Sequence, residues 1–506
     1  MFESREVDYS IFNSLLAQVS KYYEIYYAPD TVAMLKPIID NKDMNLTQEA
    51  VDYNSMLLSN ILSNIKYNVK DVPVVFIERD GALSTSEYRD ATFYIAYIDE
   101  NGQYQVETVE RNGTMKIRGN STANKAKNPY NIKFSSKVDL FDLGAGKKYC
   151  LMANFFDQAL IRNSLAFDLA QSLGLDYTSK YKMVEVYLNG ECDGLYMLTT
   201  PVDVGENRVD IDEENDFLFE ITSGGHGDDN ARHWMTTDGL FAPFANLKLV
   251  IEDTDKMSAE TYSKMYAYYW QINYAIYSGD WEQINNWVDV DSMAKYYLLH
   301  EYLKALDYCY DSTRFYVEDG KLHGGPVWGF DYGIGNFAIG AGSGTHDKTG
   351  LAYHNYNVEY AEKSEGVLYD KDSPDGIWAS TTGYWANSQW GNACGNGYFK
   401  QLYNYSPEFV ELLCEYMETY DMQFTLLYED VIVSKKEKYQ NSIDKHDKDA
   451  DYTAARMRNW QIYNIISDVD HACDGYIEIS HNHAINYLRE WLQRRHEWMK
   501  KAYVME

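Results

Sequence analysis

The segment KMVEVYLNGECDGLYMLTT, residues 182–200, decides the fold that we predict for this chain. Both halves of the segment are strand-like, and Asn189-Gly190 separates them. An Asn-Gly pair between two such runs is the strongest short-range signal for a β-hairpin. Upstream of it, short strand-like runs recur from about residue 72, and a helical pattern occupies about 158–173. We therefore expect a β-rich region around 72–204.

The rest of the chain is expected to be mainly helical. Apolar residues recur at helical spacing in the first 70 residues, in the last hundred, and at about 258–278 and 290–304. A second hairpin is predicted at Asp319-Gly320, and residues 333–400 show little periodicity, which is typical of a long functional or flexible loop. The expected organisation is an α+β protein with a helical N-terminal extension at 1–71, a β-rich part at about 72–204, and a helical part at about 258–506.

Composition limits the functions that the chain can have. Its 506 residues include 45 Lys and Arg against 77 Asp and Glu, for a net charge of −32. Nucleic-acid binding needs clustered cations, so we expect no nucleic-acid partner, whereas a few local cations suffice for a nucleotide. The chain contains no apolar run of about 18 residues, so no transmembrane segment is expected. The 47 tyrosines leave two interpretations open, core packing and a saccharide-binding or interface surface.

Location and partners are predicted from weaker signals. The first ten residues, MFESREVDYS, lack the cationic and apolar stretches of a signal peptide. The acidic, Tyr- and Asn-rich, Pro-poor composition is nevertheless typical of exported bacterial proteins. We expect an extracellular or cell-surface protein, and a cytoplasmic location stays open. Trp378, Trp385 and Trp390 either stack on saccharides at the cell surface or pack a loop against the helices.

Residues 117–134 contain the first candidate site. The run RGNST, which begins at Arg118, follows a predicted strand, and a second strand carries Lys133. Small residues let backbone N–H groups approach an anion, while the Ser121 hydroxyl and the lysines add donors and charge. Four cations lie within 16 residues of this acidic chain: Arg118, Lys125, Lys127 and Lys133. The segment is either a phosphate-binding loop or a solvated hairpin with charged flanks.

Two aspartates in the second half of the chain form the other candidate site. Asp307 follows a predicted helix and Asp331 ends an apolar strand, with the hairpin at Asp319-Gly320 between them. Two such acids suit phosphoryl transfer, in which one carboxylate accepts a hydroxyl proton and the other holds the magnesium that bridges the phosphates. The alternative is that both acids only cap turns.

These segments, in this order, resemble the CotH family of spore-coat-type atypical protein kinases. The resemblance rests on four runs: RGNST…KNPYNIKF (118–134), FFDQALIRNSLAFDLA (155–170), VEVYLNGECDGLYMLTT (184–200) and STRFYVEDGKLHGGPVWGFDYGIGN (312–336). It covers residues 72–340 and implies a CotH kinase-like domain over 72–506, with a β-rich N-terminal lobe and a helical C-terminal lobe. It also implies transfer of phosphate, or of another ATP-derived group, to Ser or Thr of a protein substrate.

The resemblance also implies roles for individual residues. Asp307 is implied as the catalytic acid, and Asp331, with Ser312, as a ligand of Mg²⁺ or Mn²⁺. Lys133 is the best match for a lysine that pairs with the phosphates of ATP. The residues implied as ATP contacts are Arg118, Ser121, Lys127, Lys133 and Arg162.

The chain also departs from the family pattern. The family typically has Trp-Asp-(Phe/Tyr)-Asp where this chain has WGFD, so Gly329 replaces one carboxylate. Ser312 or Thr313 stands where many kinases have a magnesium-binding Asn. These losses keep a second function open, that of a catalytically degenerate CotH domain serving as an extracellular binding or structural module.

Overall fold

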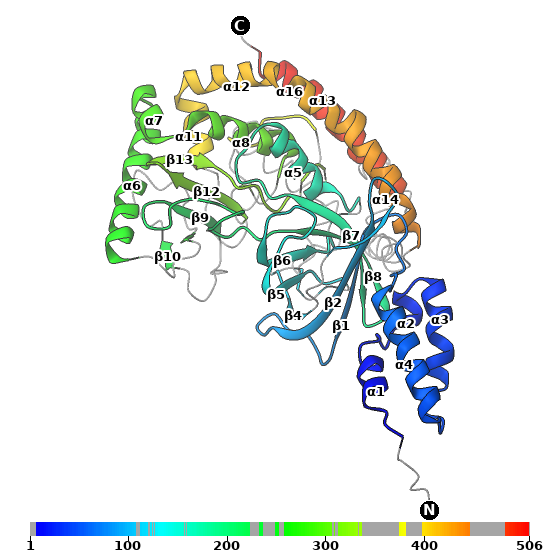
Figure 1. Ribbon diagram of the computed structural model, residues 1–506. Coiled ribbons are helices and arrows are strands. Elements are labelled where there is room, and N and C mark those ends of the chain that lie inside the picture. The colour runs from blue at the N-terminus through cyan, green and yellow to red at the C-terminus, as the bar shows by residue number, and fades with distance from the viewer. Residues whose placement is uncertain are drawn as a thin grey trace, which may run out of the picture.

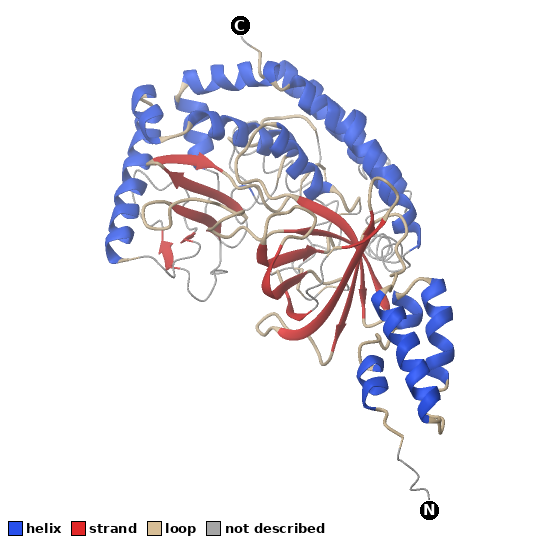
Figure 2. Ribbon diagram, viewed as in Figure 1, coloured by secondary structure: helices blue, strands red, loops and turns tan. Residues whose placement is uncertain are grey.

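The computed structural model describes residues 7–107, 112–119, 122–123, 125, 127–155, 157, 159–222, 232–235, 248–251, 258–305, 308, 312–331, 333–335, 374–380, 397–445 and 481–504. These residues form a closed β-barrel, a second β-sheet and two groups of helices (Figure 1; Figure 2).

Four helices at the N-terminus pack on the outside of the barrel. They are α1 (Ser10–Leu16), α2 (Tyr23–Tyr26), α3 (Pro29–Asp40) and α4 (Gln48–Ser63). Helix α4 begins after Thr47, whose hydroxyl accepts a hydrogen bond from the N–H of Ala50 (3.3 Å). The apolar faces of these helices share one buried cluster with Phe76 and Tyr94 of the barrel strands. The N-terminal extension is therefore joined to the barrel by an apolar core.

Seven strands close into the barrel (Figure 1). In the order in which they pair, they are β1 (Val74–Arg79), β7 (Tyr181–Leu188), β8 (Glu191–Thr199), β6 (Gly146–Met152), β5 (Tyr130–Val138), β4 (Asn112–Ile117) and β2 (Arg89–Ile98), with β3 (Tyr104–Val106) added at β2. The β7–β8 hairpin completes the ring, because β7 pairs in parallel with β1 while β8 pairs with β6. Strand β1 pairs in turn with β2, which closes the circle.

Alternate residues of the strands fill the barrel. Ile132 and Phe134 of β5 and Val184 and Val186 of β7 are fully buried in one apolar cluster. Each such side chain contributes about 1.5–3 kcal/mol by leaving water, so the alternation holds the register of the strands. The residues between these positions, such as Lys133, lie on the outer face of the barrel.

A five-stranded sheet and its helices form the other half of the molecule. The sheet has the order β10 (Arg232–Met235), β11 (Lys248–Ile251), β9 (Phe217–Thr222), β12 (Thr313–Glu318) and β13 (Lys321–Gly324). Helix α5 (Arg162–Ser172) lies between barrel strands β6 and β7 in the sequence. The helices that follow the barrel strands are α6 (Ala259–Ser278), α7 (Trp281–Trp287), α8 (Val290–Leu303), α11 (Gly397–Tyr405), α12 (Pro407–Thr419), α13 (Asp421–Leu426), a π-helical turn (Leu427–Val431), α14 (Ile432–Lys445) and α16 (His481–Ala502). Helices α12, α13, α14 and α16 form an arc along the top of Figure 1, and α14 contacts β8 of the barrel.

This architecture corrects the predicted kinase-like fold. We expected a β-rich N-terminal lobe followed by a helical C-terminal lobe. Instead, the early strands close on themselves as a barrel, and a second sheet lies within the part expected to be helical. The local strand patterns are compatible with either arrangement. Closure depends on the pairing of Val74 with Glu185, which are far apart in the sequence and carry no local signal of their contact.

Both predicted hairpin turns are confirmed. Asn189 and Gly190 have φ values of 51° and 85°, and Asp319 and Gly320 have φ values of 50° and 79°. Positive φ at both central residues is the signature of the type I′ turn, which Asn-Gly and Asp-Gly pairs favour. These four turn residues therefore set the geometry of both hairpins.

Smaller predictions are also tested by the structure. No described helix is long and apolar enough to cross a membrane. Trp378 is buried in the helical half, which favours the packing interpretation for that residue, while Trp385 and Trp390 lie outside the described residues. Tyr296 and Tyr302 are fully buried, so core packing accounts for part of the tyrosine excess.

Candidate functional site

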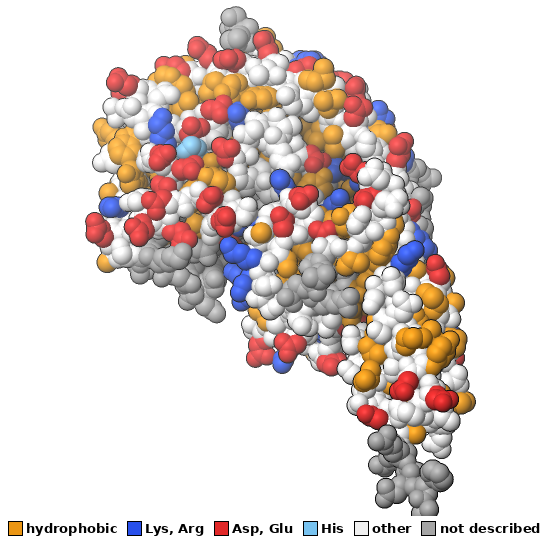
Figure 3. All heavy atoms as spheres, in the orientation of Figure 1, with side chains coloured by type: hydrophobic (Ala, Val, Ile, Leu, Met, Phe, Trp, Pro, Cys, Tyr) orange, Lys and Arg blue, Asp and Glu red, His pale blue; other side chains and the backbone are white. Residues whose placement is uncertain are grey.

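Three lysines lie on the outer face of strands β4, β5 and β6. Lys133 of β5 is directly opposite Lys148 of β6, and Lys116 of β4 is opposite Asn131, which precedes Lys133 on the same face. Directly opposite Cβ atoms are about 4.5–5.5 Å apart, and diagonal neighbours remain within reach of long side chains. We call Lys116, Lys133 and Lys148 the lysine strip. Figure 3 shows Lys and Arg side chains gathered in the notch between the barrel and the other half of the molecule.

The lysine strip brings like charges close together. Like charges directly opposite on antiparallel strands repel each other. Lys148 lies 3.5 Å from Asp203, but this ion pair is exposed to solvent and contributes little. Lys116 lies 4.9 Å from the ring centre of Tyr88. An anion with several oxygens, such as a polyphosphate, would stabilise the three lysines together.

Trp328 brings two arginines together next to the lysine strip. Arg118 follows Lys116 on the same face, and its guanidinium carbon lies 5.1 Å from the ring centre of Trp328. The guanidinium carbon of Arg314, on β12 of the second sheet, lies 5.8 Å from the same ring centre. Arg314 also pairs with Glu220 of β9 at 3.0 Å. The Nε of Arg118 is buried and has no hydrogen-bond acceptor among the described residues.

The end of the RGNST loop is anchored by Lys127. This side chain is fully buried, and its Nζ donates to the carbonyl of Leu195 (2.6 Å) and lies 4.7 Å from the ring centre of Tyr196. The Tyr196 hydroxyl lies within hydrogen-bond distance of two acceptors, the carbonyl oxygen of Asn128 (2.8 Å) and the carboxylate of Asp193 (2.6 Å). These contacts hold the loop against β8. They give Lys127 an anchoring role, and the ATP contact expected for it stays a prediction.

Helix α5 holds the loop that contains Asp331. The Arg162 side chain is fully buried and donates from Nε to the carbonyl of Gly333 (3.1 Å) and from Nη2 to the carbonyl of Ile334 (3.2 Å). Its Nη1 pairs with the buried carboxylate of Asp157. Arg162 therefore positions the turn after Asp331, and its predicted contact with ATP stays a prediction.

The same loop is held on two further sides. The Oδ1 of Asn163 accepts a hydrogen bond from the N–H of Phe330 (2.6 Å). The N–H of Ile334 donates to the carbonyl of Leu303, at the end of α8 (2.7 Å). Backbone contacts from both α5 and α8 thus fix the path of the chain around Asp331. Asp331 itself is half-buried.

Gly329 occupies a position that suits only glycine. Its φ is 74°, in the left-handed region. A Cβ added at this residue would lie 2.9 Å from the Cβ of Ser312 and 3.0 Å from its Oγ. Ser312 has a φ of 61°, so it too is in the left-handed region. A carboxylate at position 329, as in the expected Trp-Asp-(Phe/Tyr)-Asp pattern, would require Ser312 to move.

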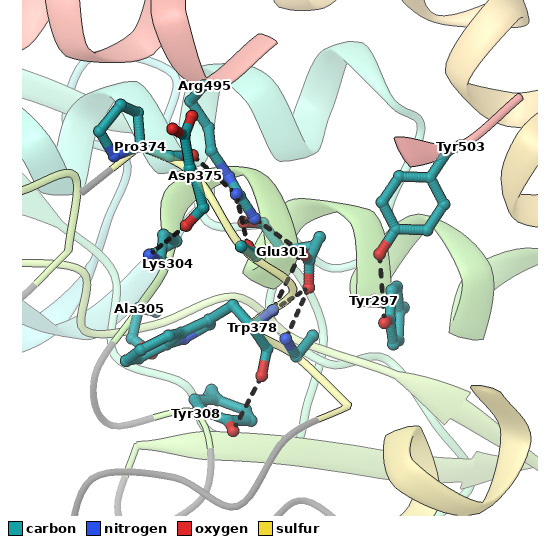
Figure 4. A network of polar contacts seen from close by, with 12 residues as sticks. Tyr297, Glu301, Lys304, Ala305, Tyr308, Pro374, Asp375, Trp378, Arg495 and Tyr503 are labelled. Atoms are coloured by element: carbon teal, nitrogen blue, oxygen red, sulfur yellow. Dashed lines mark hydrogen bonds and ion pairs between the residues drawn. The ribbon is translucent and has the colours of Figure 1, made fainter. Parts of the chain in front are cut away.

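A fully buried ion pair braces the end of α8 (Figure 4). The Nη2 of Arg495, on α16, lies 2.6 Å from the Oε1 of Glu301, on α8. The carboxylate of Glu301 also accepts hydrogen bonds from the backbone N–H groups of Trp378 and Ala379. The other N–H groups of Arg495 donate to the backbone carbonyls of Glu301, Pro374 and Gly376. We call Glu301, Arg495 and Trp378 the buried brace.

The buried brace flanks the position of Asp307. The indole Nε1 of Trp378 donates to the carbonyl of Ala305 (2.9 Å), and the hydroxyl of Tyr308 donates to the carbonyl of Trp378 (3.1 Å). Ala305 and Tyr308 lie on either side of Asp307, which is outside the described residues. The brace therefore fixes both flanks of the segment predicted to be catalytic.

His300 lies one residue before Glu301 and packs against the Asp331 loop. Its ring is fully buried, stacks on Phe330 with ring centres 5.2 Å apart, and meets Tyr296 edge-on at 4.5 Å. Burial lowers the pKa of His300 to about 3, so the ring is neutral at neutral pH. Neither ring nitrogen has a hydrogen-bond partner among the described residues.

The predicted site residues are thus distributed over three places. Arg118 and Lys133 lie on the outer barrel face, while Ser312 and Asp331 lie in the loops near Trp328. The structure describes two further predicted residues, Lys127 and Arg162, as buried anchors. The remaining two, Ser121 and Asp307, lie outside the described residues. The roles expected for all of them stay predictions.

Sequence reasoning missed several residues of this region. The sequence does not show that Lys148 lies opposite Lys133, because this depends on the register of β5 and β6. Arg314 carried a signal, because a charged residue within the apolar run TRFYV needs a partner or a function. Glu301 and Arg495 carried none, since their contact joins helices from distant parts of the chain.

The described residues contain no group of three or more His, Cys, Asp or Glu side chains that could hold a metal ion. Near Gly329 in the sequence or in space they offer the carboxylate of Asp331 and the hydroxyl of Ser312. The guanidinium groups of Arg118 and Arg314 lie at the ring of Trp328, the residue before Gly329. Magnesium prefers oxygen ligands in octahedral geometry, and nearby cations oppose its binding. The metal roles of Asp331 and Ser312 stay predictions.

Comparison with known protein families gives a match. The family described as CotH kinase protein matches residues 115–499, which is most of the chain. The matched range includes the lysine strip, the Asp331 loop and the buried brace. No curated protein matches the chain.

Proposed function

The chain belongs to the CotH kinase protein family, and we propose that it transfers phosphate, or another ATP-derived group, to Ser or Thr of a protein substrate. The observation that carries this proposal is the lysine strip. Lys133 and Lys148 stand directly opposite each other on an exposed sheet face of a protein with a net charge of −32. A polyanionic substrate explains why such an arrangement is present.

In the proposed reaction each part of the site has one task. The lysine strip and Arg118 bind the phosphates of ATP, and α5 holds the Asp331 loop next to them through Arg162. The acceptor hydroxyl oxygen attacks the γ-phosphorus, the bond from that phosphorus to the β–γ bridging oxygen breaks, and ADP leaves. The carboxylate of Asp307 accepts the hydroxyl proton. Positioning and charge neutralisation supply most of the catalysis in such transfers.

Binding and transfer need separate measurements. ATP binding is measured by calorimetry, and transfer is followed with ATP labelled at the γ- or the α-phosphate, using casein and the chain itself as acceptors. Label from the γ-position indicates phosphorylation, whereas label from the α-position indicates transfer of a nucleotidyl group. We expect Lys133→Gln to weaken ATP binding about tenfold or more.

Lys137 supplies the matched control. It lies on the same strand as Lys133 and is exposed, but it is near the far end of β5, beyond a shift in the β5–β6 register, and it pairs there with Glu206 at 3.3 Å. Lys137→Gln should bind ATP as the unaltered chain does. Equal effects of the two substitutions, or no ATP binding by the unaltered chain, would contradict the proposal.

The geometry at Gly329 favours a second candidate, a catalytically degenerate CotH domain that serves as an extracellular binding or structural module. Position 329 suits only glycine, so the local packing excludes the carboxylate that the family pattern has there. This candidate predicts that the chain binds ATP or another polyanion without transferring label from either position. Transfer above the level of an Asp307→Asn variant would exclude it.

A further inference from the structure

The region around Trp328 lacks a carboxylate where the family pattern has one. Gly329 cannot take a side chain unless Ser312 moves, because the added Cβ would lie 2.9 Å from the Cβ of Ser312. Among the described residues, no group of three or more metal-binding side chains exists. Side chains of the protein are a second possible source of positive charge for a polyphosphate in this part of the chain.

Two guanidinium groups supply positive charge at that place. Arg118, from the barrel, and Arg314, from the second sheet, lie 5.1 Å and 5.8 Å from the ring centre of Trp328, the residue before Gly329. The face of an indole ring stabilises cations and fixes their positions. Glu220 holds Arg314 at 3.0 Å and so restrains its side chain further. Both groups are therefore held in place before any ligand arrives.

We propose that Arg118 and Arg314, held against Trp328, bind the phosphates of ATP in place of a divalent cation. The inference rests on the nucleotide-binding part of the proposed function and holds for either candidate function. Guanidinium groups bind phosphate oxygens through two parallel N–H donors and keep their charge at any accessible pH. They form one end of a cationic surface that continues along the lysine strip.

A purely structural role leaves one cost without compensation. The buried Nε of Arg118, which has no acceptor among the described residues, carries the cost of an unmade hydrogen bond. The two guanidinium groups also repel each other, and Glu220 offsets this repulsion at Arg314. Phosphate oxygens accept the missing hydrogen bond and reduce the repulsion further, because they are negatively charged.

The test compares binding with and without a divalent cation. Calorimetry is carried out with ATP and with inorganic tripolyphosphate, each in excess EDTA and in excess Mg²⁺. We expect both anions to bind in EDTA at least as tightly as in Mg²⁺, because magnesium competes for the same phosphate oxygens. Arg314→Gln and Arg118→Gln should each weaken binding in EDTA about 10- to 100-fold.

Two further variants protect the test against misfolding. Arg314→Lys keeps the charge next to Glu220 but loses the two-pronged donor geometry, so binding in EDTA should fall about 3- to 10-fold. Glu220→Gln keeps a side-chain oxygen that can accept a hydrogen bond from Arg314 but removes the competing negative charge, so binding should become tighter. Lys137→Gln again serves as the control without effect.

The outcomes separate this inference from the proposed function. ATP binding that requires Mg²⁺, or that is unchanged in both Arg314 variants, overturns the inference and leaves the proposed function standing. Tripolyphosphate binding in EDTA that Arg314→Gln weakens, with no ATP binding in either buffer, supports the arginine site and contradicts the proposed function. The absence of binding by either anion contradicts both.

Discussion

The buried brace and the lysine strip differ in how their charges are compensated. In the brace, Glu301 and Arg495 are fully buried and satisfy each other's charge together with backbone groups of the 374–380 segment. In the strip, Lys133 and Lys148 stand opposite each other on an exposed face, and Lys148 forms a partly exposed ion pair with Asp203. The first arrangement is complete without a ligand. The second is improved by an anion, which is how a binding surface differs from a structural network.

The largest expected effect comes from breaking the brace. Arg495→Leu removes one partner of a fully buried ion pair and leaves the Glu301 carboxylate without its cation. We expect the free energy of unfolding to fall by about 3–5 kcal/mol. Urea unfolding followed by tryptophan fluorescence measures the change.

Lys500, on the same helix α16, is the matched control for that prediction. It pairs with Asp421 at 2.8 Å, but both side chains are exposed. Lys500→Gln should change the free energy of unfolding by about 1 kcal/mol or less. Similar effects of Arg495→Leu and Lys500→Gln would show that the brace is not the structural network described above.

The next largest effect concerns Gly329, which lies between the two regions. Gly329→Ala places a Cβ 2.9 Å from the Cβ of Ser312 and forces a non-glycine residue to a φ of 74°. We expect a loss of about 2–3 kcal/mol in the free energy of unfolding. Ser312→Gly opens the space, so the double variant should recover about 1 kcal/mol or more of this loss. Additive effects of the two substitutions would contradict the contact.

The third effect is a dependence of stability on pH that arises next to the brace. The pKa of His300 is about 3 in the folded protein and near its usual 6.5 in the unfolded chain. Between these values the unfolded chain binds more protons, so the contribution is fully present above pH 6.5 and is lost as the pH falls toward 3. From pH 6.5 to pH 5 the loss is about 2 kcal/mol.

His300→Phe isolates this contribution, because it keeps an aromatic ring among Tyr296, Phe330 and Phe399 but cannot be protonated. Urea unfolding at several pH values should give a flatter profile below pH 6.5 for the variant than for the unaltered chain. Parallel profiles would mean that His300 does not titrate on unfolding.

The smallest expected effect is the most direct test of the difference between the lysine strip and the buried brace. Lys133→Gln removes the repulsion with Lys148, so it should raise the free energy of unfolding by about 0.2–1 kcal/mol. The same substitution is expected to weaken ATP binding. If the lysine strip serves to bind an anion, this variant should be more stable than the unaltered chain but should bind ATP less tightly. A loss of stability would show that Lys133 has a structural role instead.

Local pattern was enough to predict many elements and the position of both hairpin turns. Asn189-Gly190 and Asp319-Gly320 adopt positive φ as their residue types require. The helix expected at 158–173 is α5, and that expected at 290–304 is α8. In each case the signal is a contact or a conformation within a few residues, which the sequence displays directly.

The candidate site was predictable only in part, because the sequence shows the charge of a residue but not its burial. The cations Arg118 and Lys133 stand out in an acidic chain, so their charge marks them without any structure. Lys127 and Arg162 have the same charge, but the structure places them in full burial as anchors of the RGNST and Asp331 loops. Composition does not distinguish an exposed cation from a buried one, because burial depends on the surrounding chain.

The sequence by itself determined the local elements, the order of the family's motifs and the concentration of positive charge from Arg118 to Lys133. Only the tertiary structure decided that β7 meets β1 to close a barrel, that Lys148 faces Lys133, and that Arg118 and Arg314 share the ring of Trp328. The physical reason is the separation along the chain of the residues that interact. Periodicity and turn chemistry act over two to four residues, whereas barrel closure and charge pairing depend on which distant surfaces are buried together.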